Sequence, residues 1–377
     1  MPKYSAPGVY IEEVGFAAKP IEGVSTSTAG FVGLTRRGPF AAEKVPRELT
    51  SFARFEEIYG GTDDLKCVPK TNYVAHAAKA FFDEGGQKLF VARVRPGKSG
   101  AASVKDWQNA LDALLKVKGI SIVAAPGSTE QGRQAGAIQS RLIAQVDSAG
   151  VYRFAVLDIP KNKTPAEAVA YCREFNSKNA AFYYPWVTVA DNATVPPSGF
   201  ICGIYARNDS ERGVAKAPAN ELLRGVIGLE RLITHAEQEL LNSAGVNCLR
   251  YFADKTYRVW GARTASSDPE WKYVNVRRLL NFLEESIDRG MQWVMFEPND
   301  ESLWARMVRV VSSFLYDVWR RGALMGTKPE LGFFVRCDRT TMTQNDIDNG
   351  RLICLVGVAP TRPAEFVIIR IARNTAS

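Results

Sequence analysis

The sequence has little of the chemistry on which enzymes and metalloproteins most often depend. Only two histidines occur in 377 residues, and the six cysteines are scattered without a CxxC spacing or a Cys/His cluster. His76 and His235 have no second histidine four residues away, so a zinc-protease site is not supported, although a Ser or Cys partner elsewhere in the fold stays open. Several cysteines lie in apolar runs such as GFICGIY, which favours reduced core thiols. We expect no metal and no cofactor.

Long hydrophobic runs are also missing. No uncharged apolar stretch reaches about eighteen residues, and the N-terminus lacks the basic and then apolar pattern of a secretion signal. We therefore expect no membrane anchoring, and synthesis and folding in a cytoplasm. A length of 377 residues with 46% apolar content is enough for two or three domains with their own cores.

Phosphate-binding motifs are absent as well. The glycine-rich stretch AAPGSTEQGRQAGA has Gly127, Gly132 and Gly136 at the wrong spacing for a dinucleotide fingerprint and has no Gly-Lys-Ser/Thr. It reads as a loop followed by a helix start. We therefore predict that the protein is not an enzyme. The alternative is an α/β enzyme that binds a nucleotide or sugar.

The net charge of +8 and the pI of about 9.1 are compatible with a polyanionic partner. The densest excess, ten Lys/Arg against four Asp/Glu, lies between Lys66 and Lys118. These basic residues are spaced along predicted helices and strands and do not form a compact block, so a solvated face is favoured. A nucleic-acid-binding protein is a third hypothesis that rests on net charge alone, and we predict no nucleic acid partner.

From Ala29 onward the pattern alternates strand and helix. TAGFVGL is a strand, and YVAHAAKAFFDEGGQKLFVARVR is a helix ended by two glycines and followed by a buried strand. Three similar units follow, and PPSGFICGIYARND adds a helix rich in small residues. Helices between near-continuous Val/Ile/Ala strands predict an α/β fold, with a mainly parallel sheet covered by helices. A smaller mixed α+β domain follows it.

That last third begins with an amphipathic helix, VNVRRLLNFLEESIDRG, and then MQWVMF, which reads as a strand. A long helix follows in NDESLWARMVRVVSSFLYDVWRRG, with two adjacent apolar stripes. Its outer face carries Arg306, Arg309, Arg320 and Arg321, for which a solvated face is the simplest interpretation. LGFFVRCDRT and GRLICLVGVAP are two further predicted strands.

Both ends of the chain read as strands attached through loose segments. Val9, Tyr10 and Ile11 follow a Pro-Gly turn signal, but the next residues are too rich in Gly, Pro, Ser and Thr to supply a hairpin partner. An unpaired strand invites pairing with another chain. From the residues alone, pairing within the same subunit stays open. The apolar strand at the other end comprises Phe366, Val367, Ile368, Ile369 and Ile371.

The stretch PPSGFICGIYARNDSERGVAKAPAN closely resembles a signature of contractile tail sheath proteins of phages and phage-like injection particles. Four further stretches resemble the same family in the same order, so the resemblance spans nearly the whole chain. They are APGVYIEEV, LRYFADKTYRVWGART, WKYVNVRRLLNFLEESI and NDIDNGRLICLVGVAPTRPAEFVIIRI.

The resemblance implies a structural subunit that polymerises as stacked hexameric rings around an inner tube and contracts to drive the tube through a target envelope. Residues 1–24 would form an N-terminal arm, residues 25–265 an α/β domain, residues 266–359 a C-terminal domain that faces the tube, and residues 360–377 a C-terminal arm. The arms would add Val9 to Ile11 and Phe366 to Ile371 to sheets of two different neighbours, whose accepting edge lies within residues 331–358.

The resemblance also implies the partners. They are further copies of the chain, the inner tube protein, and baseplate and tail terminator proteins. Arg306, Arg309, Arg320 and Arg321, or the loop from Asn345 to Asn349, are the candidate tube contacts. Assembly would take place in the cytoplasm of the producing bacterium, and the product would be a virion tail or a released injection particle. The chain is short for the family and is most similar to its compact sheaths.

Overall fold

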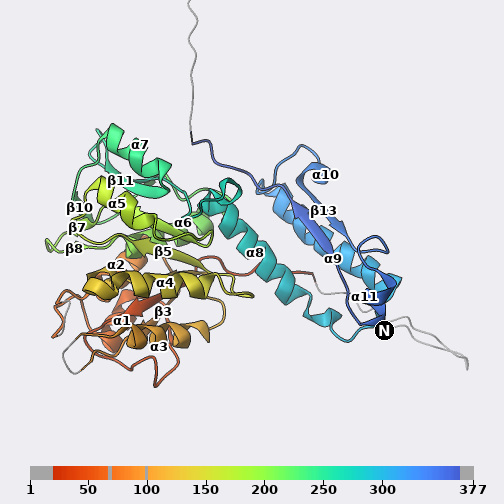
Figure 1. Ribbon diagram of the computed structural model, residues 1–377, viewed down its shortest axis with the longest axis horizontal. Coiled ribbons are helices and arrows are strands. Elements are labelled where there is room, and N and C mark those ends of the chain that lie inside the picture. The colour runs from red at the N-terminus through yellow and green to blue at the C-terminus, as the bar shows by residue number, and fades with distance from the viewer. Residues whose placement is uncertain (1–19, 67–69, 98–100, 366–377) are drawn as a thin grey trace, which may run out of the picture.

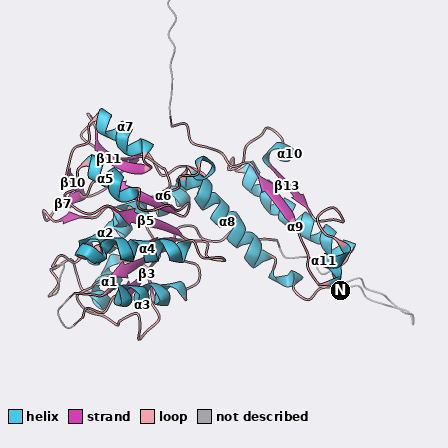
Figure 2. Cartoon of the chain, in the orientation of Figure 1, coloured by secondary structure: helices cyan, strands magenta, loops and turns pink. Residues whose placement is uncertain are grey.

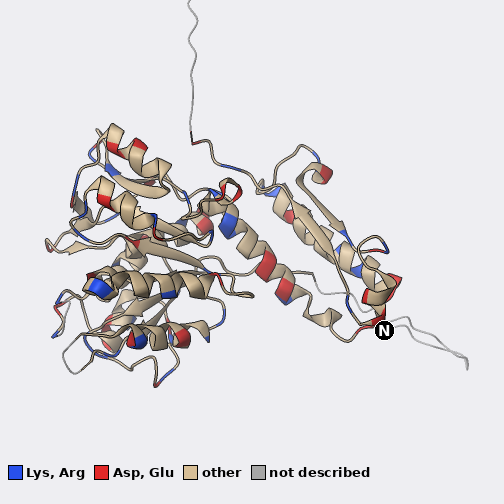
Figure 3. Cartoon of the chain, viewed as in Figure 1, with Lys and Arg blue, Asp and Glu red and all other residues tan. Residues whose placement is uncertain are grey.

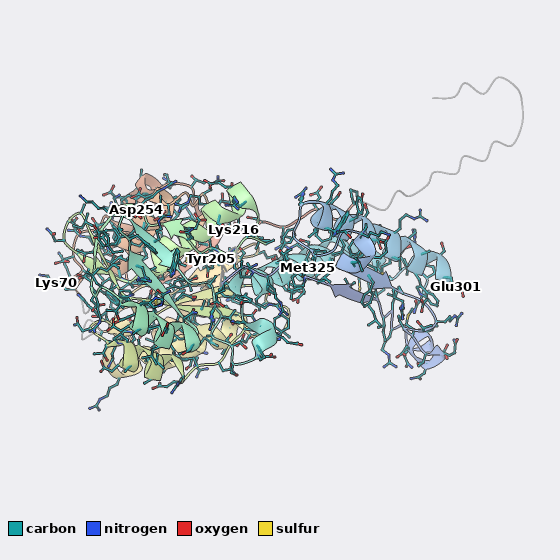
Figure 4. The ribbon with its side chains drawn as sticks, turned by 90° about the horizontal axis from the view of Figure 1, so that it is seen from above. Lys70, Tyr205, Lys216, Asp254, Glu301 and Met325 are labelled. Carbon is teal, nitrogen blue, oxygen red and sulfur yellow. The ribbon has the colours of Figure 1, made fainter. Side chains whose placement is uncertain are left out.

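The computed structural model describes residues 20–66, 70–97 and 101–365, which form a large and a small domain joined by the long helix α8 (Figure 1). Seen from above, Tyr205 lies within the large domain and Glu301 at the far end of the small one (Figure 4). None of the described helices combines the length and hydrophobicity that a membrane crossing requires.

The large domain contains a nine-stranded sheet in the order β2-β3-β1-β4-β5-β6-β11-β12-β9. The six strands from β3 to β11 are parallel, and β2, β12 and β9 pair antiparallel at the two sides. The predicted mainly parallel sheet is therefore confirmed. The strands are β1 (Ala29–Gly33), β2 (Glu48–Leu49), β3 (Leu89–Arg93), β4 (Ile122–Ala124), β5 (Phe154–Asp158), β6 (Ala180–Tyr184), β9 (Glu221–Leu222), β11 (Val246–Tyr251) and β12 (Tyr257–Trp260).

Helices cover both faces of this sheet (Figure 2). Phe31 of β1 belongs to a core with α1, α2 and α6, whereas its neighbour Val32 belongs to a second core with α3, α4, α5 and α7. Burial on both faces explains why these strands are nearly continuous apolar runs. The helices are α1 (Phe52–Tyr59), α2 (Tyr73–Asp83), α3 (Val104–Leu115), α4 (Ala135–Val146), α5 (Pro165–Cys172), α6 (Ser198–Arg212) and α7 (His235–Ser243). A small antiparallel sheet contains β7 (Val187–Val189), β8 (Thr194–Val195) and β10 (Val226–Leu229).

The small residues of α6 allow it to lie directly against α2. A Cβ added to Gly199 would come within 2.4 Å of the Cα of Ala77, and one added to Gly203 within 2.6 Å of the Cβ of Glu84. Only glycine permits so close a contact between two helix backbones. The PPSGFICGIY stretch is therefore a packing surface in the centre of the large domain.

The small domain packs α9 against the C-terminal half of α8 and against a two-stranded sheet of β13 and β14. Asp300 caps α9 through a 2.8 Å hydrogen bond from the Leu303 amide, and the apolar stripes of α9 are covered within the domain. The elements are α8 (Val274–Gly290), α9 (Glu301–Arg320), α10 (Pro329–Gly332), β13 (Phe333–Arg336), α11 (Gln344–Asp348) and β14 (Leu355–Val358).

The prediction of a strand in MQWVMF was wrong. The segment contains a 3-10 helix, η4 (Gln292–Val294), within the connection between α8 and α9. Trp293 and Val294 pack against the small-domain core, so their apolar side chains are covered there without forming a strand. Phe296 has a φ of 68° and is fully exposed.

Candidate assembly surfaces

The described titratable groups form no arrangement suited to metal binding. In the described part of the chain, no group of three or more His, Cys, Asp or Glu side chains is placed so that it could hold a metal ion. His76 is buried in α2, 3.9 Å from the Asp191 carboxylate, and burial lowers its pKa. His235 is exposed at the start of α7 and lies 3.4 Å from Glu239. The five described cysteines are free, and four of them are buried.

Asp158 ends the parallel strand β5, a position where α/β enzymes often place functional groups. Here it is buried and accepts hydrogen bonds from the Ser198 amide at 2.9 Å and the Ser198 hydroxyl at 2.7 Å. Burial raises its pKa to about 7. The carboxyl thus holds the first turn of α6, and sequence reasoning missed it because its partner lies forty residues away.

Residues 360–365, the described root of the predicted C-terminal arm, return from the small domain to the large domain. Its last described residue, Glu365, accepts two hydrogen bonds from Arg263, at 2.7 and 2.9 Å, and one from Asn242 at 3.1 Å. Lys272 and Tyr273 contact the same carboxylate at 3.1 Å. Burial alone would raise the pKa of Glu365, but these hydrogen bonds outweigh it and lower the pKa to about 2.

Residues 20–26, the described root of the predicted N-terminal arm, run antiparallel to α8. Ile21 lies over Gly290 at the small-domain end, where an added Cβ would come within 2.7 Å of the Ile21 side chain. The Val24 amide donates to Ser286 at 3.1 Å, and the Thr26 carbonyl accepts from Arg278 at 2.9 Å. The segment then enters β1 in the large domain.

The two arm roots are therefore fixed at opposite ends of α8. Ile21 lies at its last residue, whereas Glu365 binds Lys272 and Tyr273 immediately before its first. Seventeen helical residues at about 1.5 Å each place these points roughly 25 Å apart. Val9, Tyr10, Ile11 and the apolar residues from Phe366 to Ile371 lie outside the described residues.

The sheet of the small domain has two described strands. Phe333, Val335 and Val358 pack on the core with α9. On the other face Phe334 is 55% exposed, and its ring lies over Gly357, where an added Cβ would be 2.1 Å away. The outer edges of β13 and β14 have no paired strand within the described part of the chain. An isolated two-stranded sheet would be marginal, and this one is stabilised on one face by α9.

The four outer arginines predicted as tube contacts lie on α9 or directly after it, in different environments. Arg306 is half-buried, pairs with Glu297 at 3.0 Å and lies over the Trp293 ring. Arg309, Arg320 and Arg321 are exposed, the last two at the C-terminal end of α9. Along the ribbon in Figure 3, basic and acidic positions are interspersed.

Two known protein domains match most of the chain. The phage tail sheath protein central domain matches residues 100–265, and the phage tail sheath C-terminal domain matches residues 266–373. The chain belongs to the phage tail sheath protein family. A prophage major tail sheath protein of Pseudomonas aeruginosa is 25% identical over 95% of this chain and 94% of its own length.

Solved sheath structures agree over the full length. The contracted helical sheath of the anti-feeding prophage is 32% identical, with a TM-score of 0.80 over 99% of this chain and all of that chain. The contracted sheath of the extracellular contractile injection system PVC is 29% identical, with a TM-score of 0.81 over 100% of this chain and 99% of that chain. The protein is thus a structural subunit of a contractile tail sheath, and the resemblance seen in the sequence is confirmed.

Proposed function

We propose that copies of this sheath subunit form stacked rings of six around an inner tube, and that the assembled sheath shortens to drive the tube through a target envelope. The observation that carries the proposal is the two-stranded sheet of the small domain, whose described edges are unpaired. Unpaired strand edges expose backbone hydrogen-bonding groups that can pair with strands of another chain.

The strands that complete the sheet come from two neighbours. Val9, Tyr10 and Ile11 would add one strand, and the apolar run from Phe366 to Ile371 would add the other. The anchoring of the arm roots at opposite ends of α8 supports donation to different neighbours, because the two arms leave the subunit roughly 25 Å apart. Each subunit would then be tied to others through backbone hydrogen bonds while its domains stay rigid.

This arrangement requires no bound fuel. Linked subunits slide and tilt as rigid bodies, and the free energy stored during assembly on the tube is released as neighbours gain contact area. We therefore propose a structural protein without catalytic activity. A thermal shift screen with nucleotides and sugars tests the enzyme alternative, because specific stabilisation by one of them would favour it.

The inner tube is the proposed partner of the small domain. Arg309, Arg320 and Arg321 are suited to weak, reversible contacts because they are exposed, whereas Arg306 is engaged by Glu297 and Trp293. The loop from Asn345 to Asn349 overlaps α11 and offers further polar groups. Baseplate and tail terminator proteins would bind the two ends of the sheath, and assembly would precede release from the cytoplasm of the producing bacterium.

Deletion of the arms tests the proposal. Purified full-length protein should form rings or tubes visible by electron microscopy, and variants that lack residues 1–20 or 366–377 should stay as folded monomers. Circular dichroism and thermal unfolding establish that the variants are folded. Normal polymers from either truncated variant would contradict strand donation by that arm.

A further inference from the structure

A groove with a volume of about 890 Å³ lies beside the C-terminal arm root. Its walls are α7, the segment from Ala215 to Asn220, the end of β12 and residues 361–365. Trp260, 37% exposed, and alanines such as Ala217 and Ala262 make much of the lining apolar. Charged side chains of both signs, among them Glu239 and Arg362, surround them. An apolar centre with a polar rim is the usual anatomy of a protein interface.

Two buried polar atoms of the lining residues lack partners among the described residues. Asn275 is 2% exposed, and its side-chain nitrogen donates to the carbonyls of Ala215 and Thr361, whereas its Oδ1 accepts nothing. The Nε of Arg250 is likewise buried without an acceptor. The Asn275 Oδ1 needs a hydrogen-bond donor, and the Arg250 Nε needs an acceptor. A peptide backbone supplies both.

The arm root connects this groove to the linkage between subunits. Glu365 holds the root against the large domain, and twelve residues follow it in the sequence. The proposed donated strand, Phe366 to Ile371, follows Glu365 directly, and its six residues span roughly 20 Å at about 3.3–3.6 Å each. The copy that receives the arm therefore lies within that distance of the groove. This step rests on the strand donation proposed above.

We propose that the groove binds an extended segment of a second copy of this chain in the assembled sheath. The segment places apolar side chains against Trp260 and the alanines, and its backbone bonds to Asn275 and Arg250. This contact is separate from strand donation, because it involves the large domain and neither β13 nor β14. It provides each subunit with an additional attachment beside the arm that leaves it.

Point variants of the full-length chain test the groove. Trp260→Ala removes its largest apolar side chain, and Glu239→Arg reverses a rim charge that is 70% exposed, so the second variant leaves the fold intact. Leu115→Ala, at a side chain 38% exposed on α3, and Glu57→Arg on α1 are matched controls away from the groove. Each groove variant should raise the concentration required for assembly about tenfold, the size of one lost interface contact. The controls should assemble as the unmodified chain does.

Hydrogen exchange provides a second readout. Helix and sheet hydrogen bonds already protect the amides of α7 and β12 in free subunits, and these amides should exchange more slowly still in sheaths. Groove variants that assemble like the controls, or equal exchange in both states, would overturn the inference while strand donation stands. A small molecule that copurifies with the free subunit and stabilises it would be a different occupant of the groove and would also overturn the inference. If arm deletion leaves assembly unchanged but the groove variants impair it, strand donation fails and the groove contact stands.

Discussion

Arg263 grips Glu365 through two parallel hydrogen bonds, Nε to Oε1 at 2.7 Å and a terminal nitrogen to Oε2 at 2.9 Å. Arg263 follows β12 of the large domain, and Glu365 lies in the segment that comes from the small domain, so the pair joins the two domains. Both side chains are largely covered, at 13% and 19% exposure. Two parallel hydrogen bonds between a guanidinium and a carboxylate fix both the position and the orientation of the Glu365 side chain.

Glu365→Gln should release the arm root. The variant loses charge-assisted hydrogen bonds worth about 2 kcal/mol, and amides of residues 359–365 should exchange faster with solvent while the large-domain core does not change. The folded pKa of about 2 lies below the ordinary value near 4.3, so this stabilisation is complete above about pH 4 and is lost as the pH falls through 2. An unchanged exchange rate would show that the Arg263–Glu365 pair does not hold residues 359–365 against the large domain.

Arg278→Ala should destabilise the subunit strongly. Arg278 and Asp209 are 3% and 2% exposed and lie 2.6 Å apart, so removal of the guanidinium leaves a buried carboxylate without its partner. We expect a loss of about 3–5 kcal/mol in the free energy of unfolding, measured with urea. Lys79→Ala on α2 is the control, since its pair with Asp83 is exposed on both sides, at 52% and 50%, and should cost less than about 1 kcal/mol. Equal losses would contradict the argument.

Gly199→Ala should weaken the contact between α6 and α2. The added methyl group would come within 2.4 Å of the Ala77 Cα, so the helices must separate, at a cost of about 1–3 kcal/mol. Gly136→Ala in α4 meets nothing within 4 Å and should be neutral or stabilising by up to about 1 kcal/mol. Thermal unfolding of both variants distinguishes a packing effect from a general effect of glycine replacement.

Asp158→Asn should alter the pH dependence of stability. The folded pKa of about 7 is raised above the ordinary value near 3.9, so the contribution of Asp158 is most favourable below pH 4 and is lost as the pH rises through 7. The amide keeps an acceptor for the Ser198 amide and is never charged. The variant should therefore lose less stability between pH 4 and pH 7 than the unmodified chain, measured by urea unfolding at each pH. A parallel pH profile would contradict this assignment.

Arg320→Glu with Arg321→Glu should weaken binding of the extended sheath to its tube. Exposed charge pairs contribute about 0.2–1 kcal/mol each, so the effect is small for one subunit and adds up over a ring. Cosedimentation with tubes should fall, and more so at low salt, while contracted sheaths still form. Lys116→Glu on the large domain is the control. Unchanged cosedimentation would exclude these arginines as tube contacts.

The helix-covered sheet could be predicted because its signals are local. Asn72 caps α2, Gly85 ends it with a φ of 110°, and the strands are apolar on both faces, so periodicity and end signals agree. MQWVMF misled for the same reason: its composition favours a strand, but strand formation requires a neighbour, and the connection between α8 and α9 has none among the described residues.

The sequence by itself determined the α/β class, the apolar stripes of α8 and α9, and the family, because helix and strand periods and contiguous signature stretches are written along the chain. Only the tertiary structure decided that Glu365 binds Arg263, that Arg278 binds Asp209, and that the arm roots lie at opposite ends of α8. These contacts join residues as far apart in the sequence as Ile21 and Gly290. No local pattern specifies such pairs, because their geometry exists only after the two domains have packed against α8.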